Sequence, residues 1–124
     1  MNKILLLVVG CGGFIGTVGR YMVQSLAVKY LPLSFPYGTM TVNLLGSFFI
    51  GLIFGLAEKG GWMDSEWRFF FATGLCGGFT TFSSFSFESI VLLREGHFGS
   101  FGLYVVLSVV LCLLAVYAGL MVAR

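Results

Sequence analysis

The polar side chains of this sequence gather in one stretch, residues 73–89, which reads TGLCGGFTTFSSFSFES. It holds three glycines, three threonines and four serines in otherwise apolar surroundings. The pair Gly77-Gly78, followed by Thr80-Thr81, is poor helix-forming sequence and predicts a helix break near 76–81. A break frees carbonyl and N–H groups that can hold ions. One hydroxyl alone can bond back to its own helix, whereas the whole cluster beside a glycine pair favours a functional site.

Two further sets of polar residues recur every fourth position, a spacing that places each set on one face of a helix. They are Thr39, Asn43 and Ser47 in one set, and Tyr104, Ser108 and Cys112 in the other. A polar stripe on an apolar helix is a candidate wall of a pore. The alternative is that these groups hold helices together, with hydrogen bonds worth only about 0.6 kcal/mol each. Both interpretations stand at this point.

The charged and aromatic residues favour an anion over a cation. Hydroxyl and amide groups do not decide the sign, because they can donate or accept. Cation pathways carry rings of carboxylates, but Glu88 is the single acid within the expected spans, and Arg20 is the single cation inside the first span. Phe82 and Phe85 can turn ring edges of partial positive charge toward one space. Since the chain has 14 phenylalanines, ordinary packing explains any one ring better.

The composition predicts an integral membrane protein that is not an enzyme. Of 124 residues, 58% are hydrophobic and 10% are charged, against about 45–50% and about 25% in soluble domains. A soluble domain of this size would expose too much apolar surface. The net charge of +2 is too small to indicate nucleic-acid binding. One histidine and three scattered cysteines provide little material for a disulfide framework, a zinc site or a catalytic site.

The spacing of the charges divides the chain into apolar segments that are each long enough, at about 20 residues, to span a membrane. We expect a single all-α domain, residues 1–124, whose third helix is broken near its middle. The four expected helices lie near 3–28, 38–57, 67–94 and 99–122. Trp62 and Trp67 fall where an interfacial aromatic belt belongs. Gly12 and Gly16, four residues apart, predict close packing of helix backbones.

Three motifs together carry a resemblance to a known family. They are the run TGLCGGFTTFSSFSFE, the preceding Gly38-Thr39-x-x-Val42-Asn43, and Gly19-Arg20 in the first helix. In length, spans, loop spacing and motifs, the chain closely resembles the CrcB/Fluc family of fluoride channels. The resemblance implies a passive, fluoride-selective channel of the microbial plasma membrane that expels fluoride from the cell. It also implies an antiparallel, dual-topology homodimer with two pores.

The resemblance further implies a set of side chains along the fluoride pathway. These are Thr39, Asn43, Phe82, Ser84, Phe85, Glu88, Tyr104 and Ser108. Asn43 would offer its amide donor to fluoride, and Phe82 and Phe85 would line the pore with their ring edges. Glu88 would lie near one mouth of the pathway. Arg20 would match the arginine of the vestibule.

A structural sodium ion is also implied by the resemblance. The backbone carbonyls of Gly77 and Thr80 would hold it at the centre of the dimer, on the symmetry axis. Cys112 stands where a hydroxyl often continues the polar track of the last helix. A thiol is a weaker hydrogen-bond donor than a hydroxyl, so this chain departs from the family pattern at the far end of that track.

The basic residues favour neither orientation in the membrane. With the N-terminus inside, four of them would face the cytoplasm and three would lie toward the outside. The two sets are Lys3, Lys59, Arg68 and Arg124, and Arg20, Lys29 and Arg94. Under the positive-inside rule this difference is almost no bias. The charge distribution therefore predicts insertion in both orientations, which an antiparallel dimer requires.

Two other functions remain open from the sequence. A small multidrug-type antiporter has four spans and about this length, but its proton-coupled exchange needs an acid inside a span, typically the first. The first span here has Arg20 and no acid. The third candidate is a non-conducting membrane subunit held to a partner by its glycine faces, which the polar stripes disfavour. The expected partners are therefore fluoride, the lipid bilayer and a second copy of the chain.

Overall fold

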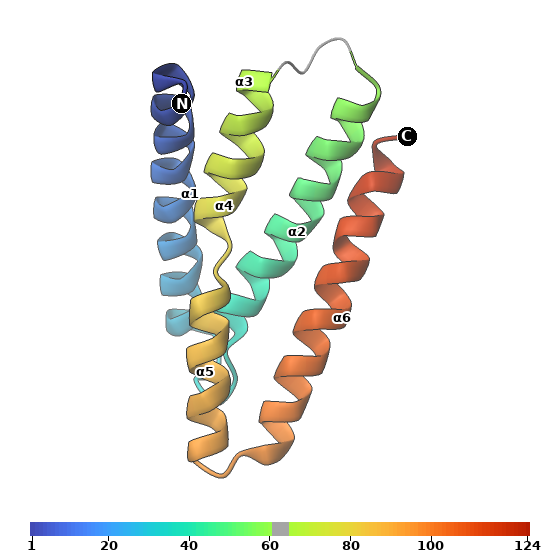
Figure 1. Cartoon of the computed structure of the whole chain (residues 1–124). Helices are drawn as coiled ribbons and strands as arrows, with labels where there is room; N and C mark the ends of the chain where they lie inside the picture. The colour runs from blue at the N-terminus through green and yellow to red at the C-terminus, as the bar shows by residue number, and fades with distance from the viewer. Residues whose placement is uncertain (61–64) are drawn as a thin grey trace.

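The computed structural model describes residues 1–60 and 65–124, and the chain forms no strand within these ranges. The elements are α1 (Lys3–Tyr30), α2 (Tyr37–Glu58), α3 (Ser65–Arg68), the π-helix η1 (Phe69–Cys76), α4 (Gly77–Phe79), α5 (Phe82–Arg94) and α6 (Phe98–Val122) (Figure 1). The all-helical fold and the broken third helix predicted from the sequence are confirmed. Trp62, one of the two tryptophans assigned to an interfacial belt, lies outside the described residues.

Among the described residues, three helices are long and apolar enough to cross a membrane. They are α1, α2 and α6, with 28, 22 and 25 residues. Many of their large apolar side chains face outward, for example Phe14 in α1, Phe49 in α2 and Leu113 in α6. Exposure of this kind is unfavourable in water but not against lipid tails, which are equally apolar. The chain is therefore a multi-pass membrane protein.

The break of the third helical segment lies at Thr80 and Thr81, where the backbone is extended. The last hydrogen bond of the preceding helix is donated by the Thr80 N–H to the Cys76 carbonyl over 3.0 Å. The Thr81 hydroxyl then caps α5 by accepting a hydrogen bond from the Ser84 N–H at 3.1 Å, the usual role of threonine at this position. Two β-branched residues after the pair Gly77-Gly78 thus end one helix and begin the next.

Close backbone contact joins α1 to the first half of the broken segment. A Cβ atom on Gly16 would fall on the Leu75 carbonyl oxygen, and one on Gly12 would lie 2.5 Å from the Phe70 carbonyl oxygen. Only glycine fits at such positions, which is how small residues let helices approach in a membrane. The packing predicted for Gly12 and Gly16 is confirmed.

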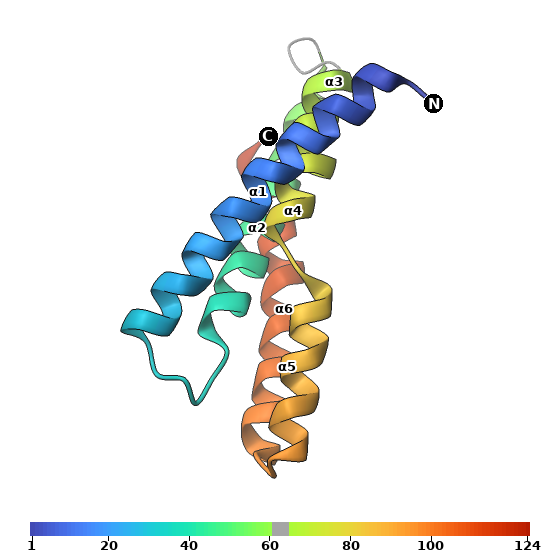
Figure 2. The ribbon, with the colours of Figure 1, turned by 90° about the vertical axis from the view of Figure 1, so that its left-hand side faces the viewer.

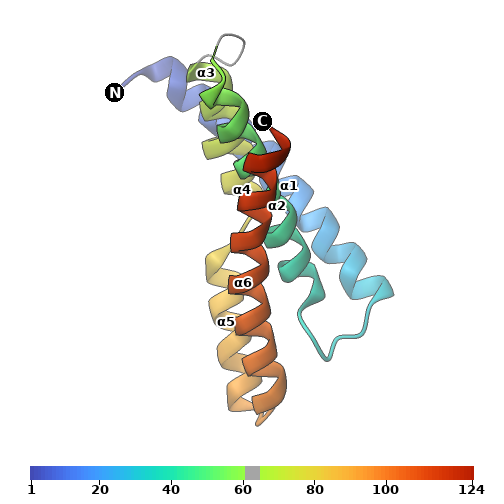
Figure 3. The same cartoon turned by 90° about the vertical axis from the view of Figure 1, so that its right-hand side faces the viewer.

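The helices form two packed pairs. In one pair α1 lies beside η1 and α4, and in the other α2 lies along α6, where a Cβ on Gly51 would fall on the Val116 carbonyl oxygen. Figures 2 and 3, taken from opposite sides, both show the α1–α2 connection swinging away from α5 and the start of α6. This divergence places the α1–α2 connection opposite α5 and α6.

A tight turn holds α5 against α6. Gly96 has φ +80°, and its N–H donates to the Leu93 carbonyl at 3.1 Å while the His97 N–H donates to the Leu92 carbonyl at 2.9 Å. This pair of bonds is the Schellman ending of a helix, in which glycine takes the left-handed conformation. The turn brings the polar residues of α5 next to those of α6.

Candidate functional site

The Asn43 amide on α2 holds the extended backbone of the break. Its Oδ1 accepts a hydrogen bond from the Thr81 N–H over 2.7 Å, and its Nδ2 donates to the Thr81 carbonyl over 3.1 Å. An amide nitrogen carries two N–H groups, so one remains for another acceptor. Asn43 therefore fixes the break and still presents a donor there.

The Gly77 and Thr80 carbonyls lose, at the break, the donors that they would have in a continuous helix. The Thr81 N–H, the helical partner of the Gly77 carbonyl, donates to Asn43. The Ser84 N–H, the partner of the Thr80 carbonyl, donates to the Thr81 hydroxyl. Neutral carbonyl oxygens are suitable ligands for a hard cation such as sodium, so these residues fit the implied ion in chemistry. Two carbonyls from one chain are too few to enclose it.

A cavity of about 400 Å³ lies beside the break, and we call it the break cavity. It brings together residues that the sequence analysis assigned to the pathway or the sodium site: Asn43, Gly77, Thr80, Phe82, Phe85 and Ser108. Among the described residues, no carboxylate or basic side chain lines it. The Ser108 hydroxyl is buried and has no hydrogen-bond partner within the described residues, although buried polar groups are normally paired. The cavity thus offers hydrogen-bond donors to a small ligand.

The two pathway phenylalanines form one aromatic wall of the break cavity. The ring centroids of Phe82 and Phe85 lie 5.6 Å apart with the rings tilted by 46°. Phe85 also packs on the Tyr104 ring at 5.1 Å. Phe82, in contrast, is 78% exposed, so the protomer leaves most of this ring uncovered.

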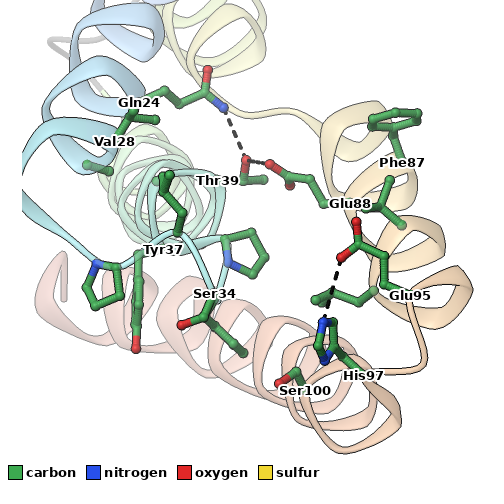
Figure 4. Close-up of a pocket in the computed structure, with 18 residues that line it drawn as sticks. Gln24, Val28, Ser34, Tyr37, Thr39, Phe87, Glu88, Glu95, His97 and Ser100 are labelled. Atoms are coloured by element: carbon green, nitrogen blue, oxygen red, sulfur yellow. Dashed lines mark hydrogen bonds and ion pairs between the residues drawn. The ribbon is translucent and has the colours of Figure 1, made fainter.

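A second cavity, of about 520 Å³, lies between the α1–α2 connection and the residues of α5 and early α6 (Figure 4), and we call it the mouth cavity. Thr39 and Glu88 both line it. The Thr39 hydroxyl donates to Glu88 Oε2 over 2.8 Å, and the Tyr104 hydroxyl donates to Oε1 over 2.9 Å. The carboxylate of Glu88 therefore gathers donors from α2 and α6, although the three residues lie far apart in sequence.

Two of the expected site residues lie at the break and not among the residues that line either cavity. Arg20 donates from Nε to the Gly78 carbonyl over 2.9 Å, so α1 also holds the break from its side. Ser84 is bonded through its hydroxyl and its N–H to the Thr81 hydroxyl. The positions of the remaining pathway residues relative to fluoride stay predictions.

The roles of two residues at these sites were not predicted from the sequence. Thr81 caps α5 and is held by Asn43. The sequence feature that indicates the cap is a threonine directly before a helical run. Gln24 donates from Nε2 to the Thr39 hydroxyl over 3.1 Å. Its signal was its place as the only amide side chain of the first span, since polar residues inside a membrane are usually functional or paired.

The fold and these sites define a class: a small, multi-pass helical membrane protein with two cavities, at and beside a broken helix, into which a few polar side chains project. The sequence model of the family described as CrcB-like protein, Camphor Resistance (CrcB), matches residues 7–120. The chain belongs to this family.

Close relatives match most of the chain. A protein of Leptospira interrogans is 46% identical over 105 residues, covering 85% of this chain and 83% of the relative. Proteins of Campylobacter jejuni and Azobacteroides pseudotrichonymphae are each 44% identical over 119 residues, covering 96% of this chain and 97% and 94% of the relatives. All three are named fluoride-specific ion channel FluC, which describes transport and no enzymatic reaction. The resemblance stated from the sequence is confirmed.

Proposed function

We propose that this chain is a passive, fluoride-selective channel that lets fluoride leave the cell across the plasma membrane, the inner membrane in a two-membrane cell, and so limits fluoride toxicity. The observation that carries the proposal is the chemistry of the break cavity. Within the described part of the chain, its lining provides the second N–H of Asn43 and the unpaired hydroxyl of Ser108 but no charged group. Donors without a protein acceptor suit an anion, and the names of the relatives identify fluoride as the ion that those proteins conduct.

Fluoride must lose much of its hydration to enter this cavity. Hydrogen bonds to an ion are roughly twice as strong as those between neutral groups, so Asn43 and Ser108 offset part of that loss. The ring edges of Phe82 and Phe85 add a weaker attraction for an anion. A channel also needs binding weak enough for release, and a few neutral donors meet that condition better than a fixed cation would.

The broken segment, residues 65–94, completes a bundle of four spans in this proposal. It is helical except at the break, and the two halves follow each other along one direction in Figure 1. At about 1.5 Å of rise per helical residue, it is long enough to cross the hydrocarbon core of about 30 Å. Its polar groups at the break are acceptable at membrane depth because they are bonded to α1 and α2.

The proposed channel is an antiparallel homodimer with two pores. Phe82 is 78% exposed and Gly77 is exposed as well, so the break cavity lacks a wall that a second copy can supply. An antiparallel arrangement brings the two breaks together at a symmetry axis. The almost even division of basic residues between the two sides is consistent with both insertions.

A sodium ion held at that axis is part of the proposal. The Gly77 and Thr80 carbonyls of two copies offer neutral oxygen ligands, and the N–H groups that would otherwise bond them are engaged elsewhere. When bound, sodium supplies a fixed positive charge and joins the two chains at their breaks. Its role is structural, because an ion on the axis lies outside both pores.

The other predicted residues act along the route in this account. Thr39 and Tyr104 present hydroxyl donors at Glu88, and Glu88 marks one mouth of the pathway. Arg20 keeps guanidinium N–H groups besides the one bonded to Gly78, and its charge attracts anions toward the break. Ser84 contributes a hydroxyl beside Thr81.

The proposal is tested by loading liposomes that carry the purified protein with fluoride and following efflux with a fluoride electrode. Fluoride efflux from the liposomes that carry the protein, and none from protein-free liposomes, supports the channel. Substrate-cation uptake driven by a proton gradient would support the multidrug-type antiporter instead. No transport of either kind would support a non-conducting subunit and overturn the proposal.

A further inference from the structure

A chain of hydrogen bonds from α1 reaches the carboxylate of the mouth cavity. Gln24 donates from Nε2 to the Thr39 hydroxyl over 3.1 Å, and Thr39 donates on to Glu88 over 2.8 Å (Figure 4). The Tyr104 hydroxyl reaches the other carboxylate oxygen from α6 over 2.9 Å. The network therefore joins all four of α1, α2, α5 and α6 at one acid.

The direction of these bonds follows from the number of protons. Glu88 accepts at both carboxylate oxygens, from Thr39 and from Tyr104, so Thr39 uses its single hydroxyl proton toward Glu88. The Thr39 oxygen can then only accept from Gln24, which must present its NH₂ and not its carbonyl oxygen. The Gln24 N–H thus donates to Thr39 and the Thr39 O–H donates to Glu88, so the two hydrogen bonds run in one direction toward the carboxylate.

Burial makes Thr39 dependent on this partner. Its side chain is 2% exposed, so water cannot easily replace the donor that Gln24 supplies. A threonine hydroxyl inside a helix has an alternative, because it can turn to a backbone carbonyl of its own helix. Thr41, two residues further along, does this by donating to the Tyr37 carbonyl over 2.8 Å. Gln24 favours the rotamer in which the Thr39 hydroxyl points into the mouth cavity.

We propose that Gln24 is a positioning residue of the ion pathway. It holds the Thr39 hydroxyl in the rotamer that donates to Glu88, so that this carboxylate is fixed in place where an anion passes the mouth cavity. The inference rests on the proposed channel function, and it assigns to α1 a part in ion selection that acts through α2.

Two substitutions separate the donor of Gln24 from its size. Gln24→Met keeps the length of the side chain but removes the amide donor. Gln24→Glu keeps the shape but replaces the donor by acceptors, so that two carboxylates compete for one Thr39 proton. We expect fluoride efflux to fall roughly five- to tenfold in Gln24→Met, the scale of one hydrogen bond, and at least as far in Gln24→Glu. Ser25→Ala, at the next and exposed position, should keep wild-type efflux.

A double-mutant cycle tests whether Gln24 acts through the Thr39 hydroxyl. In a Thr39→Val background, Gln24→Met should lower efflux no further, because the hydroxyl that it positions is gone. If Thr39→Val alone stops efflux, Thr39→Ser serves as the background, since it restores the hydroxyl, and the loss on Gln24→Met should return in full. Unchanged efflux in Gln24→Met, or independent losses in the cycle, would overturn the inference. An inactive wild-type protein would instead overturn the channel itself.

Discussion

Phe82 and Phe85 carry the part of the account that depends most on single side chains. Their rings lie 5.6 Å apart beside the donors of the break cavity. Changing either one to Ile keeps much of the apolar volume but removes the ring edge and its partial positive charge. We predict that Phe82→Ile and Phe85→Ile each reduce fluoride efflux sharply while the proposed dimer still purifies intact.

The matched control for these variants is Phe70→Ile. Phe70 packs against the Trp67 and Phe71 rings and does not line the break cavity. Fluoride efflux through the Phe70→Ile variant should remain near the wild-type value. Equal efflux from Phe82→Ile and the wild type would remove the ring-edge argument at that position.

The types and spacing of the site residues could be predicted from the sequence, but their hydrogen-bond partners could not. The interval of four from Thr39 to Asn43 is local information, and both residues do line cavities. That Asn43 bonds both polar atoms of the Thr81 backbone is not local information. It depends on how α2 packs beside a break 38 positions further along the chain, which no spacing within one helix reveals.

The contact between α1 and η1 decides whether the helical elements can pack as they do. Adding a Cβ at Gly16 would force it onto the Leu75 carbonyl oxygen, a backbone atom that cannot turn aside. Overpacking of this kind typically costs about 1–3 kcal/mol. We predict that Gly16→Ala lowers the midpoint of thermal unfolding of the purified protein and reduces efflux.

Gly10→Ala is the control, because a Cβ at Gly10 meets nothing within 4 Å. Gly10 lies on the same helix as Gly16, and both substitutions add one methyl group. Since alanine favours a helix more than glycine does, the midpoint of the Gly10→Ala variant should stay equal or rise. An equal fall of the unfolding midpoint and of the efflux in both variants would show that close packing at Gly16 does not cause them.

At the element scale, the break was predictable and the π-helix was not. Gly77-Gly78 and the two threonines are poor helix formers in isolation, so their effect appears in sequence. The π-helical stretch Phe69–Cys76 contains apolar residues that suit an α-helix equally well. Its widened turns accompany the close approach of Gly74 to Gly12, which is a tertiary contact. π-helical segments are frequent at functional sites, and this one leads directly into the break.

The molecule as a whole exposes the features that a second copy would cover, and the proposed arrangement requires both insertions. On a background without cysteine, a single Ser34→Cys change places a thiol in the exposed α1–α2 connection. We predict that a membrane-impermeant thiol reagent labels part of this protein from outside intact cells, and that the rest is labelled only after access to the inner face. Protection of every copy from one face would exclude an antiparallel dimer.

The sodium ion is tested by its removal. If Gly77 and Thr80 carbonyls of two chains hold it, exhaustive replacement of sodium by a bulky organic cation removes their ligand. Unsatisfied carbonyls at membrane depth cost several kcal/mol each, so the midpoint of thermal unfolding and the efflux should both fall. Restoring sodium should restore both. If neither quantity changes, the break is stabilised without sodium.

The central claim is that the chain conducts fluoride passively and selectively. The most direct measurement is the reversal potential of the current through a planar bilayer with unequal fluoride, chloride and proton concentrations on its two sides. We predict a reversal potential that follows the fluoride gradient and does not move when the chloride or proton gradient is changed. A reversal potential that follows either of those other gradients would contradict it.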